Sequence, residues 1–141
     1  MTSFIQDEMP ASLKKSLSQS KAEYVRLGKT GLKLSLPILG AMSFGSSKWM
    51  DWVIDNENQV LDLLKAAYDR GINTWDTANV YSNGESERFI AKAIKKFDIP
   101  RRKLVILTKC FAYVGEQPDV FTVSYGAAMT NSKDYVNQGG R

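Results

Sequence analysis

The chain has 141 residues, the length of one ordinary domain, and its 43% hydrophobic and 24% charged content is typical of a globular protein rather than a disordered one. It contains no histidine and one cysteine, Cys110, which excludes an internal disulfide framework, a zinc site built on those ligands and a Ser-His or Cys-His nucleophile pair. The net charge of +4 is modest and we find neither a long apolar run nor a secretory signal, so we expect a cytoplasmic protein without metal, membrane or nucleic-acid partners.

The N-terminal part of the chain predicts a polar tail followed by a β-hairpin. Residues 1–23 are rich in serine and lysine, which favours a mobile tail. Apolar and polar residues alternate in 24–27 and in 32–36, and the glycine-bearing segment 28–31 between them predicts the turn of a hairpin. The Gly-Lys-Thr triplet in that turn suggests a phosphate-binding loop, but Glu23 stands where such a loop needs its first glycine. The turn interpretation is therefore favoured.

Strands and helices alternate after the hairpin. Residues 38–40 predict a short buried strand, and 41–55 predict a loop. A helix is expected between Asn56, which is spaced from Gln59 as in a capping box, and Gly71, a typical helix stop. The apolar residues at helical spacing within it are Val60, Leu64, Ala67 and Tyr68.

A second unit of the same kind follows. Residues 72–75 predict a strand, and Glu85 and Glu87 stand where a helix N-terminus favours negative charge. Pro100 lies beyond the end of that helix, and the apolar run 104–108 is typical of a strand buried on both faces. The apolar face of the helix is expected to consist of Ile90, Ala93, Ile94 and Phe97.

The order hairpin, strand, helix, strand, helix, strand predicts an α/β fold. Such alternation indicates a parallel sheet built from right-handed crossover units, and it fits a doubly wound sheet as well as a (β/α)8 barrel. Residues 111–141 contain several turn formers and no convincing periodicity, so we expect a loop or tail there.

Three polar side chains are predicted to meet at one edge of the sheet. Functional residues of parallel α/β folds gather where strands end. Asp76 closes the second strand of the alternating series, Lys109 closes the third, and Tyr81 follows in the loop after Asp76. A free tyrosine has a pKa of about 10, and a neighbouring ammonium group favours its ionised form, so such a trio could protonate a carbonyl oxygen. On spacing alone, a structural ion pair beside a surface tyrosine fits equally well.

Three stretches of the chain carry a family resemblance. They are YVRLGKTGLKLSLPILGAMSFGS, GINTWDTANVYSNGESERFIAKAI and KLVILTK, and together they cover roughly residues 24–110. They resemble the N-terminal part of NADP-dependent aldo-keto reductases, in the fungal branch related to aryl-alcohol dehydrogenases and versiconal hemiacetal acetate reductases. The second stretch resembles the long family signature DTA-x-x-Y-x-x-G-x-S-E. The resemblance implies the first part of a (β/α)8 barrel with a hairpin capping its bottom, incomplete because 111–141 would end before the third helix.

The resemblance also implies catalytic roles. Tyr81 corresponds to the family's general acid, Lys109 to the residue that favours ionisation of that tyrosine, and Asp76 to the partner of the lysine. The family's fourth catalytic residue is a histidine at the end of the fourth strand, and most of the NADP-binding segments also follow later in the barrel. Residues 1–141 do not include these parts.

Further positions are implied for the cofactor NADP(H) and for the substrate. Ala41, Met42 and Asp76 correspond to positions at the nicotinamide ribose end of the cofactor. Trp49 and Phe111 correspond to candidates for the substrate pocket, although packing beneath the loop explains Trp49 equally well.

The function implied by the resemblance is the NADPH-dependent reduction of an aldehyde or ketone, aromatic ones included, to an alcohol. The partner would be a small-molecule carbonyl compound or alcohol. Residues 1–141 alone are expected to be inactive, because three strands cannot close a barrel that typically takes ~250 residues. Two alternatives remain open: a non-catalytic truncated product or pseudoenzyme, and a small autonomous α/β domain with a binding role.

Overall fold

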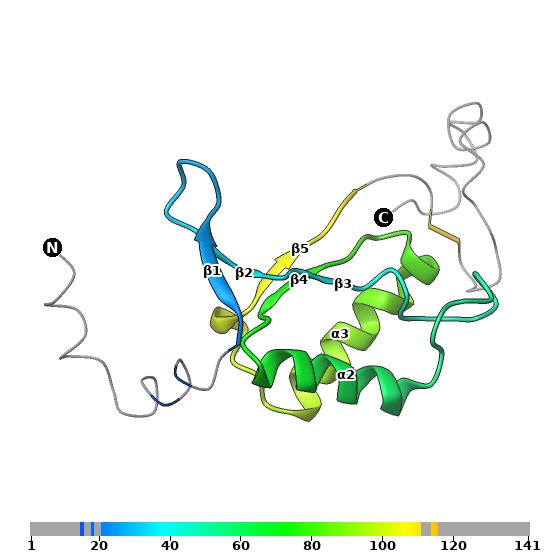
Figure 1. Cartoon of the computed structure of the whole chain (residues 1–141). Coiled ribbons are helices and arrows are strands. Elements are labelled where there is room, and N and C mark those ends of the chain that lie inside the picture. Colours follow the sequence, from blue (N-terminus) through cyan, green and yellow to red (C-terminus); the bar gives the residue numbers. More distant parts are fainter. Residues whose placement is uncertain (1–14, 16–17, 19–20, 111–113, 116–141) are drawn as a thin grey trace, which may run out of the picture.

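The computed structural model describes residues 15, 18, 21–110, 114 and 115. Its centre is a parallel sheet of three strands in the order β3 (Leu39–Gly40), β4 (Thr74–Asp76) and β5 (Val105–Leu107). Both long helices lie on the same side of this sheet (Figure 1). The predicted alternation and the parallel arrangement of adjacent strands are therefore confirmed.

The hairpin lies at the N-terminal ends of the parallel strands. Its strands β1 (Glu23–Arg26) and β2 (Lys33–Leu36) pair antiparallel. The Ser35 N–H donates to Thr74 Oγ1 at 2.9 Å, and the Thr74 N–H donates to Ser35 Oγ at 3.0 Å. Thr74 is the first residue of β4, so the hairpin sits opposite the strand ends that carry the candidate site, and its glycine turn has no place in that site.

Helix α2 (Glu57–Asp69) begins and ends at the predicted residues. The Asn56 side chain accepts a hydrogen bond from the Gln59 N–H at 3.1 Å, which satisfies one of the free N–H groups at the helix start. After the helix, Gly71 adopts a φ of 86°, which favours glycine, and its N–H donates to the Tyr68 carbonyl at 2.9 Å.

Helix α3 (Glu85–Lys96) has Glu85 and Glu87 in its first turn, as predicted, and two lysines in its last turn, where positive charge is favoured. It packs beside α2, and Lys92 Nζ joins the two helices through an ion pair with Glu57 Oε2 at 2.6 Å. Within the described residues, no helix is long and apolar enough to cross a membrane.

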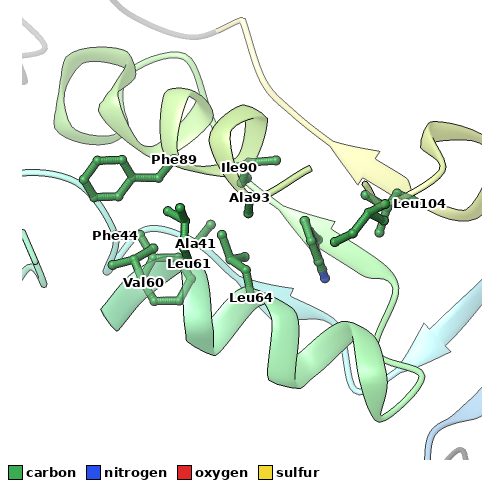
Figure 2. Packing of buried hydrophobic residues seen from close by; sticks show 11 residues of the cluster. Ala41, Phe44, Val60, Leu61, Leu64, Phe89, Ile90, Ala93 and Leu104 are labelled. Carbon is green, nitrogen blue, oxygen red and sulfur yellow. The ribbon is translucent and has the colours of Figure 1, made fainter. Parts of the chain in front are cut away.

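The core lies between the two helices and the covered face of the sheet. Figure 2 shows the side chains of α2 and α3 pointing toward each other and toward the strands. Trp75 of β4 is fully buried in this cluster, as expected for the central strand. The other buried members of the cluster are Ala41, Phe44, Val60, Leu61, Leu64, Phe89, Ile90, Ala93, Ile99 and Leu104.

The prediction that the strands at 38–40 and 104–108 are buried is wrong for the described part of the chain. Ile38 is 38% exposed, and all three residues of β5 are half-buried. These strands form the two edges of the three-stranded sheet, and α2 and α3 cover only one of its faces. These two strands therefore carry more apolar side chains than the described part of the chain buries.

Candidate functional site

The candidate site lies where β4 and β5 end. Asp76 is the last residue of β4, and Lys109 follows shortly after β5. The pairing of the two segments continues past the strands, because the Thr77 N–H donates to the Leu107 carbonyl at 2.8 Å and the Asn79 N–H donates to the Lys109 carbonyl at 3.3 Å. These bonds align the two chains so that the Lys109 side chain reaches back to Asp76.

The Lys109 ammonium group joins the predicted side chains. Its Nζ donates to Asp76 Oδ1 at 2.6 Å, to the Thr77 carbonyl oxygen at 2.8 Å and to the Tyr81 hydroxyl oxygen at 3.2 Å. An ammonium group has three hydrogens, so all of them have an acceptor here. The structure therefore brings Asp76, Tyr81 and Lys109 together, with the carboxylate and the ammonium at ion-pair distance.

The surroundings favour a charged lysine. Burial lowers the pKa of Lys109, but hydrogen bonds to Asp76 and Tyr81 and the charges of these groups outweigh it, so its pKa lies above the ordinary value. Lys109 therefore remains protonated at neutral pH. Since the Tyr81 oxygen accepts from this ammonium, the phenolic hydrogen stays available for a bond to another molecule.

Tyr81 begins the short 3-10 turn η1 (Tyr81–Gly84), which connects the end of β4 to α3. The Trp49 ring, from the loop after β3, lies 6.5 Å from the Tyr81 ring between centroids and 6.3 Å from the Trp52 ring. Trp49 is only 5% exposed. The structure therefore places this candidate substrate residue as a packing partner beside the Tyr81 ring.

The positions expected at the cofactor lie beside Asp76. The fully buried Ala41 donates its N–H to the Asp76 carbonyl at 2.8 Å, and the next residue, Met42, is 41% exposed. Met42 is thus the member of this pair whose side chain a ligand could reach. Phe111, the second candidate for the substrate pocket, lies outside the described residues.

A buried hydrogen-bond network, which was not predicted from the sequence, joins α3 to the residues that follow β3 and β4. The Ser86 hydroxyl donates to the Ala41 carbonyl at 2.7 Å and lies 3.0 Å from Thr77 Oγ1. Because the single Ser86 hydrogen is used on that carbonyl, Thr77 must be the donor in the second bond. Ser86 is completely buried, on the same face of α3 as Phe89 and Ala93. A serine at the spacing of the apolar residues was the signal that could have revealed it.

Ser86→Ala is expected to lower the free energy of unfolding by about 1–3 kcal/mol, because it leaves a buried carbonyl and a buried threonine hydroxyl without their partner. Urea denaturation of the wild-type and variant chains measures the difference. Ser47→Ala is the matched control, since Ser47 is exposed and bonds only to the exposed Asp55 among the described contacts; its expected change is within about 0.5 kcal/mol. Equal effects of the two substitutions would contradict the structural importance of the network.

No metal site is evident in the part of the chain that the structure describes. No group of three or more His, Cys, Asp or Glu residues there could hold a metal ion. The ionisable groups that meet at the candidate site are a carboxylate, an ammonium and a phenol.

Comparisons with known proteins point to one protein family. A sequence model described as "Aldo/keto reductase family" matches residues 38–138. The chain is 54% identical over 137 residues to the aldo-keto reductase dtxS3 of Metarhizium robertsii, a match that covers 94% of this chain and 36% of the relative. It is 48% identical over 118 residues to the versiconal hemiacetal acetate reductase of Aspergillus parasiticus, covering 84% of this chain and 34% of that protein. The chain thus spans about a third of the length of the curated relatives it matches.

A solved structure shows the same fold. The holo form of the aldo-keto reductase AKR11C1 from Bacillus halodurans is 27% identical and superposes with a TM-score of 0.53. The match covers 65% of this chain and 26% of that protein. The described strands and helices therefore correspond to a portion of a (β/α)8 barrel, and they do not themselves form a closed barrel.

Proposed function

The chain belongs to the aldo/keto reductase family, and we propose that it forms the N-terminal part of an NADPH-dependent reductase that converts an aldehyde or ketone to an alcohol. In this proposal, residues 24–110 contribute the hairpin and the first three barrel strands. Most of the expected tail at 1–23 and most of the expected loop at 111–141 lie outside the described residues, and β1 begins at Glu23.

One observation carries the proposal: a lysine ammonium group that contacts both a carboxylate and a phenol oxygen at the C-terminal edge of the sheet. Lys109 Nζ lies 2.6 Å from Asp76 Oδ1 and 3.2 Å from the Tyr81 hydroxyl oxygen. The three residues are separated in the sequence: Asp76 ends β4, Tyr81 lies in the turn after β4, and Lys109 follows β5. A surface ion pair alone would not require a phenol as the third member.

The proposed reaction uses Tyr81 as the proton donor. As hydride reaches the carbonyl carbon of the substrate, the carbonyl oxygen gains negative charge, and the Tyr81 hydroxyl transfers its proton to that oxygen. The products are an alcohol and a tyrosine phenolate, which the Lys109 ammonium stabilises by its positive charge. Asp76 holds Lys109 charged and oriented toward Tyr81, and solvent then restores the phenolic proton.

The described residues fit one end of the cofactor. The side chains of Asp76 and Lys109 are 34% and 42% exposed, and the exposed Met42 follows the strand beside β4, so polar and apolar groups face the same strand edge. We propose that Met42 and Asp76 contact the nicotinamide ribose end of NADPH, while the buried Ala41 fixes the spacing between them. When bound, NADPH would supply the hydride.

The test uses a completed chain, which we define as residues 1–141 followed by the remaining C-terminal part of the Metarhizium robertsii relative. We expect it to consume NADPH when aromatic or aliphatic aldehydes and ketones are added, and the decrease in NADPH absorbance measures the rate. Residues 1–141 alone are the comparison, and we expect no reduction from them. A folded completed chain that leaves every carbonyl compound unreduced would contradict the proposed function.

A further inference from the structure

The turn that carries Tyr81 has an unusual backbone. Ser82 adopts φ 49° and ψ 38°, and the next residue, Asn83, adopts φ 52° and ψ 42°. Both lie in the left-handed region, which residues other than glycine rarely occupy, and two in succession are rarer still. Such conformations persist only where the surrounding structure holds them in place. The contacts of Ser82 therefore indicate what fixes this turn.

The Ser82 side chain packs against the loop that follows β3. Ser82 is completely buried, and its hydroxyl oxygen accepts a hydrogen bond from the Ser46 N–H at 3.0 Å. Gly45 lies directly beneath it: a Cβ at this glycine would stand 2.2 Å from Ser82 Oγ and 2.3 Å from Ser82 Cβ. The serine side chain thus occupies space that exists only because residue 45 has no side chain.

Backbone hydrogen bonds close the loop that contacts Ser82, so this loop can hold the Ser82 side chain in place. The Gly45 N–H donates to the Ile54 carbonyl at 3.1 Å, and the Ile54 N–H donates to the Ser43 carbonyl at 2.9 Å. The Ser46 carbonyl accepts from the Trp49 N–H at 3.0 Å. Since the Trp49 ring packs beside the Tyr81 ring, one segment contacts the phenol side chain and also holds the backbone next to it.

We infer that Ser82 is a positioning residue for Tyr81. Its buried side chain, seated over Gly45 and bonded to the Ser46 N–H, holds the turn in the left-handed conformation that directs the Tyr81 hydroxyl to Lys109 Nζ. The inference rests on the proposed function, because positioning matters only if Tyr81 donates the proton. It extends that function by assigning the orientation of the proton donor to a contact outside the Asp76–Lys109–Tyr81 trio.

Ser82→Ala in the completed chain tests the inference, because alanine removes the hydroxyl and keeps the Cβ. We expect kcat for carbonyl reduction to fall about 10–100-fold with little change in KM for NADPH, since a small displacement of a reacting group has an effect of this size. We also expect the pH profile of kcat to shift, because the contact between the phenol and the ammonium is loosened. Ser47→Ala, in the same loop but exposed, is the control and should match the wild type.

A double-mutant cycle separates positioning from general damage to the loop. Gly45→Ala places a methyl group against Ser82 and should lower kcat, in part because the Gly45 φ of 149° disfavours any side chain. Adding Ser82→Gly removes both colliding atoms, so the double variant Gly45→Ala/Ser82→Gly should be more active than Gly45→Ala alone. If the effects of the two substitutions on kcat are independent of each other, the contact between Gly45 and Ser82 does not influence Tyr81.

An NMR measurement on residue 81 tests the inference without relying on enzyme activity. The NMR signal of fluorotyrosine at position 81, assigned by its loss in Tyr81→Phe, should move in Ser82→Ala and stay fixed in Ser47→Ala. An unchanged Tyr81 signal together with unchanged kcat would overturn the inference. If the wild-type completed chain is inactive but the signal still moves, the proposed function fails while the contact between Ser82 and the Tyr81 turn stands.

Discussion

Tyr81→Phe in the completed chain is expected to reduce the rate of carbonyl reduction by roughly 10²–10⁴-fold, the usual contribution of a positioned proton donor. Phenylalanine keeps the ring that packs 6.5 Å from Trp49, so the turn and its neighbours should remain in place. Only the hydroxyl that bonds to Lys109 is lost. The rate of NADPH consumption with a saturating aldehyde measures the effect.

Tyr24→Phe is the matched control for this substitution. The Tyr24 hydroxyl donates to the Gly71 carbonyl at 2.7 Å, at the opposite end of the strands, so its loss should leave the rate unchanged. Equal rates for the wild type and Tyr81→Phe would mean that another group supplies the proton.

Lys109→Met is expected to lower the rate by a comparable factor, roughly 10²–10⁴-fold. Methionine preserves most of the length of the side chain but removes the positive charge beside the Tyr81 oxygen, so the developing phenolate loses its stabilising partner. The side chains of Lys109 and Asp76 are 42% and 34% exposed, and ion pairs at such positions contribute only about 0–1 kcal/mol to stability. Loss of rate should therefore occur without unfolding, which circular dichroism can verify.

Lys95→Met is the corresponding control, because Lys95 is an exposed lysine in the last turn of α3. Its rate should equal that of the wild type. A fully active Lys109→Met variant, alongside an inactive Tyr81→Phe variant, would show that the tyrosine donates its proton without help from the ammonium.

The elements with strong local signals were predictable from the sequence. Asn56 and Gly71 mark the ends of α2 because a side-chain cap and a positive φ are requirements of single positions. The ion pair between Asp76 and Lys109 was predictable because consecutive parallel strands end at the same edge, which places residues after them side by side.

Properties that depend on distant parts of the chain were not predictable in the same way. The apolar run 104–108 predicts burial on both faces, but burial depends on which neighbours are present, and β5 is half-buried among the described residues. Phe97, at the C-terminal end of α3, was expected on the apolar face of that helix but is only half-buried, with Lys65 of α2 and Lys96 over its ring at 5.9 Å and 5.3 Å. Phe89, which the periodicity did not single out, is buried instead.

The contacts that hold the candidate site in place were the least predictable from the sequence. The left-handed conformation of Ser82 has no local signal, because serine shows no preference for it. It follows from the contact with Gly45, which is remote in the sequence. Likewise, the resemblance places Ala41 at the cofactor, but only packing shows that Ala41 is fully buried and bonded to Ser86.

The most direct test of the central claim follows the hydride and the proton donor in one reaction. The completed chain is incubated with an aromatic aldehyde and NADPH that carries deuterium at the transferable position of the nicotinamide, and the alcohol is analysed by mass spectrometry. We predict an alcohol with deuterium on the former carbonyl carbon, formed by the wild type and nearly absent with Tyr81→Phe. An alcohol without deuterium, or equal amounts of labelled alcohol from both proteins, would contradict the assignment of this site to NADPH-dependent carbonyl reduction.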